Sequence, residues 1–365
     1  MPQNEIVGPE NLHNEDGSLA NPGFARALRQ TYDRSRIKAS KWRLKKWDYY
    51  LINNAECALC LTIADLGYAS LYSVSLIDFG TAAEPILDNP QPGTAPEGSR
   101  ASCKTTSVLK PFTFGRTDLP CTSKEGVSSF ENAKMKLRLT VKDGERHLAV
   151  WVKDFFKGRP LEADITLGDE PRESMVIATP FRESPLSFYL NQKIVAMRAR
   201  GSFALGGNTH IFAPDAALGL LDWGRGVWTR DNTWYWAAAQ GYQGGRRIGF
   251  NLGYGFGDTA AATENMFFLD GVAHKLDRVD FGIPDDVAGK KPAFLKPWHV
   301  TSNDGRIDFT FTPMADRIDY INLVIIVSDQ HQVMGRCTSA VTLDDGTVFE
   351  FQDLVATAEK IRNKW

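Results

Sequence analysis

From Trp47 onwards the chain is a succession of strand-length apolar runs separated by turn sequences. In MKLRLTV, at residues 135–141, apolar and polar residues alternate, which is the two-residue period of a strand with one solvent-facing side. Turn signals such as KDGE and GDEP separate such runs. The pattern favours antiparallel sheet over strand–helix–strand units, so we expect an all-β, mainly antiparallel fold.

The strand-length runs fall into two stretches of similar length, which predict two β-barrels or strongly bent sheets in tandem. Residues 1–40 are polar and turn-rich and form a lead-in segment, residues 41–205 form a first β domain, and residues 206–365 form a second. Apolar residues recur at helical spacing within residues 353–365, so a short amphipathic C-terminal helix is expected to dock on a sheet.

Composition limits the classes of partner. The formal net charge of −2, with 24% charged residues, gives no electrostatic reason to expect nucleic acid or an anionic membrane. No run approaches the roughly 18 apolar residues of a membrane span, and no signal peptide is recognised. The five cysteines are an odd, scattered set that fits reduced thiols. A soluble, cytoplasmic protein that binds a small molecule or a neutral oligosaccharide is predicted.

Tryptophans concentrate in LDWGRGVWTRDNTWYW, at residues 221–236, where four of the nine occur. In a strand, Trp234 and Trp236 share one face and Tyr235 lies on the other. The rings of Trp223, Trp228 and this pair either fill a core or line a ligand cavity in the second domain. Charged and amide side chains recur nearby, which favours a cavity.

Four residues of this region are candidates for catalysis. Asp222 and Arg225 either staple a turn as an ion pair, or place an acid beside indole rings that raise its pKa. Glu264 precedes the strand MFFL and could reach a ligand from the strand end. His210 titrates in a useful range, although histidine at such a position also serves as hydrogen-bonded structure.

Further polar residues of the region could bind a ligand together with the four tryptophans. They are Asn251, Asp258, Asn265 and Lys275. Asp258 could instead cap a turn. The glycines of NLGYGFGD let a strand bend or pass close to a ligand, and because no helix follows them a nucleotide site is not expected. No cofactor and no metal site are predicted.

The signature FALGGNTHIF, LDWGRGVW, WYWA, GFNLGYGFGD, TEN, FLDG and HKLDRVDF resembles a domain-of-unknown-function family of bacteria and fungi. The likeness extends from Trp47 to the C-terminus. A more distant resemblance is to the tandem lipocalin-like superfamily of carotenoid 1,2-hydratases, kievitone hydratase and lipocalin-like Diels–Alder cyclases. Those relatives often carry Asp-Arg-Glu-Trp-Gly where this chain has LDWGRG, so Asp222 and the tryptophans match, whereas the acidic residue after the arginine is absent.

Three functions remain open at this point. The first is a cofactor-independent enzyme of the hydratase, cyclase or isomerase type that protonates or cyclises an apolar or cyclic molecule, with carboxylic acids and aromatic faces around a carbocation. The second is a carbohydrate-active enzyme, a glycoside hydrolase or lyase, with paired carboxylates and tryptophan stacking platforms. The third is a carrier that only holds a small ligand.

Overall fold

The computed structural model describes residues 3–79, 101–113, 115, 117–286, 291–322 and 327–364. Strands dominate these residues, which contain no α-helix and only two 3₁₀ turns, η1 (Arg34–Arg36) and η2 (Lys41–Arg43). The expectation of an all-β, mainly antiparallel fold is confirmed. The described part of the chain also contains no helix with the length and apolarity needed to cross a bilayer.

The first of two large curled sheets has the strand order β7-β6-β5-β4-β15-β13-β11-β10-β9-β8. Its strands are β4 (Leu44–Asn53), β5 (Cys57–Asp65), β6 (Ala69–Asp78), β7 (Ser102–Pro111), β8 (Gly126–Glu131), β9 (Met135–Lys142), β10 (Glu145–Phe156), β11 (Arg159–Gly168), β13 (Ser184–Leu205) and β15 (Leu218–Val227). On both sides of β13 lie additional strands, β12 (Met175–Phe181) and β14 (Asn208–Phe212).

The second sheet has the order β19-β18-β17-β16-β24-β23-β22-β21-β20. Its strands are β16 (Asp231–Gln243), β17 (Arg246–Tyr254), β18 (Met266–Leu269), β19 (Val272–Lys275), β20 (Val279–Asp280), β21 (Trp298–Ser302), β22 (Asp308–Asn322), β23 (Val327–Thr342) and β24 (Val348–Lys364). All described pairings within both large sheets are antiparallel.

The lead-in segment is folded onto the first sheet. β2 (Gly23–Ala25) pairs with β12, while β1 (Glu10–Asn11) and β3 (Gln30–Thr31) form a small parallel pair. Leu12 and Tyr32 are buried in the same hydrophobic cluster as the first sheet. Residues before 40 therefore close part of the first core.

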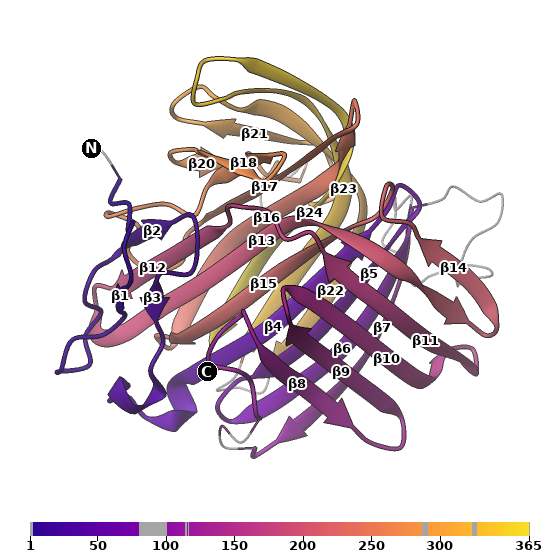
Figure 1. The fold of residues 1–365 in the computed structure, drawn as a ribbon, viewed down its shortest axis with the longest axis horizontal. Coiled ribbons are helices and arrows are strands. Elements are labelled where there is room, and N and C mark those ends of the chain that lie inside the picture. The colour runs from indigo at the N-terminus through magenta and orange to yellow at the C-terminus, as the bar shows by residue number, and fades with distance from the viewer. Residues whose placement is uncertain are drawn as a thin grey trace.

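Each sheet has its own core, and two further clusters lie between the sheets. Strand β15 illustrates the arrangement, because all ten of its residues are buried. Its Leu221 belongs to the core of the first sheet, whereas its Leu220 packs in a cluster that also contains Trp236 of the second sheet. Figure 1 shows the central strands β13 and β15 beside β16, and β16 in turn pairs with β24. We call the space between these strands the junction.

The predicted C-terminal helix is wrong, because residues 348–364 form strand β24. This strand pairs with β16 on one side and β23 on the other. Ala356 and Ala358 pack in the second core, while Val355 faces the junction. Pairing along both edges and burial on both faces outweigh the helix preference of alanine, glutamate and lysine.

The chain passes from one sheet to the other between Val227 and Asp231, about twenty residues after the expected boundary at 205/206. Strands β14 and β15 pair with β13 and so belong to the first sheet. A boundary placed at Gly206 divides this hairpin system. Consequently LDWGRGV and TWYWA lie on different sheets that face each other, and this positions the site described next.

Candidate active site

The aromatic wall of β16 faces the first sheet. Trp234 and Trp236 lie on one face of the strand and Tyr235 on the other, as period 2 predicts. Tyr235 packs inside the second core, where it stacks on Tyr254. The two tryptophans therefore line the junction between the sheets, and the prediction of a hollow within the second domain misplaces them.

Five aromatic rings from both sheets meet here and form what we call the junction cluster. The centroid of Trp228 lies 4.9 Å from that of Phe256 and 5.5 Å from that of Trp234. Trp47 of β4 lies edge-on to Trp228 at 5.4 Å and stacks on Tyr189 of β13 at 6.0 Å. Trp47 and Trp234 are only half-buried, so the cluster keeps some solvent-accessible ring surface.

Asp222 is buried in the junction and makes three side-chain contacts. Its Oδ1 accepts hydrogen bonds from Trp47 Nε1 at 2.9 Å and Asn191 Nδ2 at 2.7 Å. Its Oδ2 lies 2.5 Å from the ammonium of Lys193, which also sits 4.4 Å from the centre of the Trp236 ring. A buried carboxylate therefore has a buried counter-ion and an aromatic face beside it.

Glu264 reaches the junction from the segment before β18. Its Oε2 accepts a hydrogen bond from Asn251 Nδ2 at 3.1 Å. Asn251 is fully buried on β17, and its Oδ1 accepts a hydrogen bond from Trp236 Nε1 at 2.7 Å. The Asn251 amide therefore bonds to both the Glu264 carboxyl and the Trp236 indole, and so holds the acid beside the aromatic wall of β16.

A second acid, Glu359 of β24, lies in the same space. Its Oε1 accepts from Trp234 Nε1 at 2.8 Å, and its Oε2 accepts from Gln332 Nε2 at 2.7 Å. Only 7% of Glu359 is exposed. The carboxyl is therefore held between an indole and an amide, with no cation in direct contact in the described structure.

Two glycines make room for these side chains. A Cβ at Gly224 would lie 1.9 Å from Trp47 Cζ2, so the indole that reaches Asp222 crosses the strand at a position where only glycine fits. A Cβ at Gly253 would lie 2.5 Å from Glu264 Oε1. Glycines of LDWGRG and NLGYGFGD thus allow close approach of site side chains.

Burial raises the pKa of both Glu264 and Glu359. The positive charge of Lys193 opposes this shift at both acids, and the negative charge of Asp222 reinforces it. These four groups are therefore close enough to interact through a medium of low dielectric constant. A protonatable acid near an ionised pair is an arrangement typical of acid–base sites.

Two polar atoms of the junction have no hydrogen-bond partner within the described structure. They are the donor Trp228 Nε1 and the acceptor Asn191 Oδ1, in side chains that are 8% and 0% exposed. An unpaired buried group costs about 1–3 kcal/mol. Both residues lie next to Trp47, and both atoms are available to a polar group of a ligand or to water.

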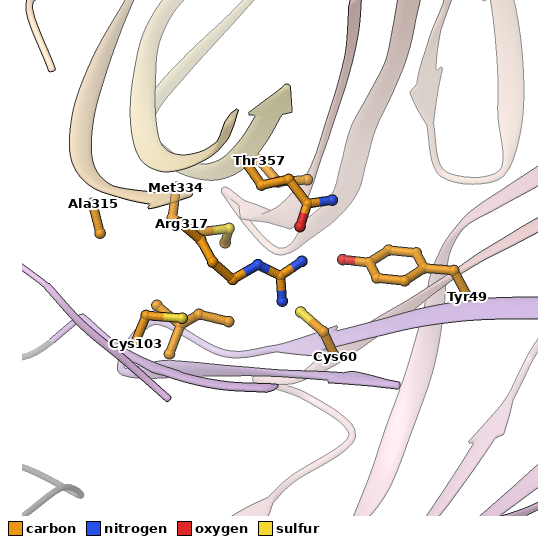
Figure 2. Close-up of a pocket in the computed structure, with 9 residues that line it drawn as sticks. Tyr49, Cys60, Cys103, Ala315, Arg317, Met334 and Thr357 are labelled. Carbon is orange, nitrogen blue, oxygen red and sulfur yellow. The ribbon is translucent and has the colours of Figure 1, made fainter. Parts of the chain in front are cut away.

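A small cavity of about 10 Å³ opens at the other end of the junction. Its walls include Tyr49, Cys60 and Cys103 of the first sheet and Arg317, Gln332 and Thr357 of the second (Figure 2). We call it the Arg317 cleft. Tyr49 is the direct neighbour of Asp222 across strands β4 and β15, and Gln332 is the donor to Glu359, so the cleft adjoins the two junction acids Asp222 and Glu359.

Arg225 and Trp223 lie on the opposite face of β15 from Asp222, because positions three apart on a strand face opposite sides. The Arg225 guanidinium pairs with Asp48 at 3.0 Å, donates to three backbone carbonyls and stacks on Trp223 at 4.3 Å. Of the two alternatives for these residues, the Asp222–Arg225 ion pair is therefore wrong. Trp223 belongs to the first core, and Arg225 lies beside it on the same face of β15, away from the junction.

Two other candidates secure the hairpin beside Glu264. Lys275 donates to Thr263 Oγ1, Asn265 O and Leu276 O at 2.7–3.1 Å. Burial lowers its pKa to about 7. Asn265 accepts from the backbone of Gly253 and donates to that of Asp277. The polar atoms of Lys275 and Asn265 are hydrogen-bonded within the hairpin. The two residues therefore position the segment that carries Glu264 and do not face the junction rings.

Asp258 and His210 lie elsewhere. Asp258 accepts two hydrogen bonds from Arg182, at 2.6 and 2.9 Å, and caps a turn at Ala260, which is the alternative considered for it. His210 on β14 stacks on Phe203 at 4.8 Å. Ten residues of β13, or about 33 Å, separate Phe203 from Lys193, so this histidine is remote from the junction.

Several junction residues were missed from the sequence. They are Trp47, Tyr49, Tyr189, Asn191, Lys193, Arg317, Gln332 and Glu359. A signal existed for two of them, because Asn191 and Lys193 stand two apart between the apolar flanks of FYLNQKIVAM, and this spacing places both on one strand face. Glu359 was hidden by the helix prediction for residues 353–365.

Comparisons with known proteins identify a family and distant structural similarities. The family model described as "Domain of unknown function (DUF2804)" matches residues 3–365. Kievitone hydratase from Nectria haematococca is similar with a TM-score of 0.45 and 10% identity, covering 98% of each chain. CghA has a TM-score of 0.44 and 10% identity, covering 99% of this chain and 97% of its own.

A putative AttH from Nitrosomonas europaea is similar with a TM-score of 0.42 and 11% identity, covering 88% of this chain and 92% of its own. The comparison with curated proteins finds no match.

Proposed function

The chain belongs to the DUF2804 family, and from the chemistry of the junction we propose that it is a cofactor-independent enzyme. The substrate is an apolar or cyclic small molecule, and the reaction is acid-assisted hydration, isomerisation or cyclisation. The observation that carries the proposal is the pair of carboxyls with raised pKa, Glu264 and Glu359, held against tryptophan rings.

The acid step uses Glu359 or Glu264 as proton donor. Desolvation moves the pKa of each towards the range in which a carboxylic acid donates near neutral pH. A proton passed to an alkene carbon leaves a carbocation on the substrate, which aromatic faces stabilise through their quadrupoles. Trp234 and Trp236 supply those faces. Trp234 is hydrogen-bonded directly to Glu359, and Trp236 is linked to Glu264 through Asn251.

Lys193 stabilises the carboxylate that remains after proton transfer. Its positive charge lowers the pKa of both acids, so it interacts more favourably with the ionised form. In a hydration, water forms the new C–O bond and its surplus proton returns to the carboxylate. In an isomerisation or cyclisation, the substrate itself returns a proton. Asp222 holds Lys193 in place for either outcome.

The orientation of the indole groups favours an apolar ligand over a sugar. Trp47, Trp234 and Trp236 each direct Nε1–H at a protein acceptor. What they offer a ligand is therefore mainly ring surface. A sugar ring needs several hydrogen bonds to its hydroxyls, whereas a terpenoid or aromatic compound needs few.

The test is a mass-spectrometric screen of polyene and prenylated aromatic compounds beside sugar oligomers. We expect a single product with either no mass change or the mass of one added water. Of the variants Glu359→Gln and Glu264→Gln, the one that removes the proton donor should lower turnover by about 10²-fold or more. Glu350→Gln, an exposed glutamate of the same strand β24, is the matched control and should keep full activity.

Other outcomes decide against the proposal. Two fragments from a sugar oligomer would establish glycoside cleavage instead. Saturable binding without any product would establish a carrier. Full turnover of a hydrated or cyclised product by the Glu264→Gln/Glu359→Gln double variant would show that neither carboxyl is the acid.

A further inference from the structure

Arg317 crosses from the second sheet to the first. It projects from β22, and its guanidinium donates to the hydroxyls of Ser75 on β6 and Thr105 on β7. Figure 2 shows the guanidinium directed into the cleft between Cys60 and the Tyr49 hydroxyl. The Arg317 cleft therefore has a positive charge at the point where the two sheets meet.

This charge has no counter-ion in the described structure. No described carboxylate lies within 4.0 Å of the Arg317 guanidinium. By contrast, the fully buried Arg225 and Arg146 pair with Asp48 at 3.0 Å and Glu170 at 2.6 Å. Partly buried cations are normally paired, because removal from water disfavours an isolated charge. Hydroxyls satisfy some N–H groups of Arg317 but do not neutralise it.

The remaining polar groups around the cleft are suited to an anion. Burial raises the pKa of the Cys60 thiol to about 11 and that of the Tyr49 hydroxyl well above 10, so both stay protonated and add no negative charge to the cleft. The nearby acid Glu359 directs its two oxygens at Trp234 and Gln332. A guanidinium whose nearest neighbours are neutral polar groups is a favourable environment for an oxyanion.

Size and position define what such an anion is attached to. A cavity of about 10 Å³ holds roughly one water-sized group, which suits an oxygen of a carboxylate and not a phosphate. Tyr49 lies edge-on to Trp236 at 6.2 Å, so this side of the cleft borders the aromatic wall of β16. We propose that the Arg317 cleft is an anion-binding subsite that takes the carboxylate end of an apolar ligand whose other end lies in the junction.

This inference rests on the proposed function only for the choice of ligand class, and it is tested by binding alone. The probes are 4-phenylbutanoate, its neutral amide and acetate, titrated against the full chain by tryptophan fluorescence at pH 8. We expect the phenylbutanoate to bind about tenfold or more tightly than either of the others. Arg317→Gln should abolish the acid-over-amide preference.

Arg336→Gln is the matched control, because Arg336 of the neighbouring strand β23 pairs with Asp353. It should keep the full preference. Equal affinity for acid and amide, or an undiminished preference in Arg317→Gln, would overturn the proposal. Acetate binding as tightly as phenylbutanoate would identify a free small anion as occupant, which overturns the assignment to a ligand's end.

The same titration with Glu359→Gln separates the two proposals. If the preference for phenylbutanoate persists in Glu359→Gln, and the parent chain itself has no turnover in any assay, the anion subsite stands and acid catalysis does not. If catalysis is found on neutral substrates and the preference is absent, the enzyme assignment stands and the subsite does not.

Discussion

The buried ion pair between Lys193 and Asp222 gives the most quantitative prediction. Lys193 is 3% exposed, and its Nζ lies 2.5 Å from Asp222 Oδ2. Lys193→Met keeps the length of the side chain but leaves the carboxylate with only two neutral donors, Trp47 and Asn191. Removing one partner of a buried pair lowers the free energy of unfolding by about 3–5 kcal/mol. That is a large part of the ~5–15 kcal/mol typical of a folded domain.

The reverse variant, Asp222→Asn, leaves the ammonium unpaired. The Trp236 ring, 4.4 Å from Nζ, offsets about 1 kcal/mol of the loss, so we expect about 2–4 kcal/mol. In the double variant both charges are gone, and the new amide oxygen can still accept from Trp47 and Asn191. Its loss should be only about 1–2 kcal/mol, against about 5–9 kcal/mol for the sum of the single variants.

Urea unfolding followed by tryptophan fluorescence measures these free energies. A control is Arg198→Met. Arg198 lies on the same strand β13 as Lys193 and forms an exposed ion pair with Asp169, so this variant should lower the free energy of unfolding by only about 0–1 kcal/mol. If the loss of the double variant equals the sum of the losses of Lys193→Met and Asp222→Asn within about 0.5 kcal/mol, the reasoning is refuted. The two groups would then not interact as a buried pair.

Three further predictions concern the glycines, the acids and the thiols. Gly253→Ala places a methyl group 2.5 Å from Glu264 Oε1, so we expect about 1–3 kcal/mol lower stability by urea unfolding and reduced turnover. Burial raises the pKa of Glu359 in the folded protein. The contribution of this carboxyl to stability is therefore complete below its pKa in the unfolded chain, and it is lost as the pH rises through its pKa in the folded protein. Glu359→Gln should gain stability relative to the parent from about pH 4 upwards. Burial raises the pKa of Cys60 to about 11, so a thiol reagent at pH 8 should label exposed Cys121 in the native protein and Cys60 only in urea, as mapped by peptide mass.

Each of these has an outcome that contradicts it. Gly8→Ala, where an added methyl group meets no atom within 4 Å, should leave stability unchanged, and an equal loss in both variants would remove the steric argument. A constant difference between Glu359→Gln and the parent across the pH series would mean that this carboxyl is not desolvated. Labelling of Cys60 at the rate of Cys121 would mean that the cleft is open to solvent.

Local patterns in the sequence were sufficient for strand content and for side-chain faces along a strand. The two-residue period placed Trp234 and Trp236 together and Tyr235 opposite them, as the structure does. The period does not reveal what each face contacts. Strand β15 is buried on both faces, so no polar side distinguished the first core from the junction.

The junction itself depends on pairings between distant segments. Trp47 on β4 reaches Asp222 because β4 pairs with β15, and Glu359 reaches Trp234 because β24 pairs with β16. The three-residue spacing of Asp222 and Arg225 was compatible with a turn, and only strand geometry separates them. The local sequence pattern therefore identified Asp222, the acid of the ion pair. Its partner Lys193 and the junction acid Glu359 were brought to the site by pairing between distant strands.

A crystal structure with the tightest ligand from the screen tests the central claim most directly. The account predicts the ligand between the two sheets, with its apolar part against Trp234 and Trp236 and a carboxyl oxygen of Glu359 or Glu264 about 3 Å from the atom it protonates or from a bridging water. A ligand enclosed within the core of one sheet, beside Tyr235 and Tyr254 for example, with the junction side chains unmoved, would contradict it.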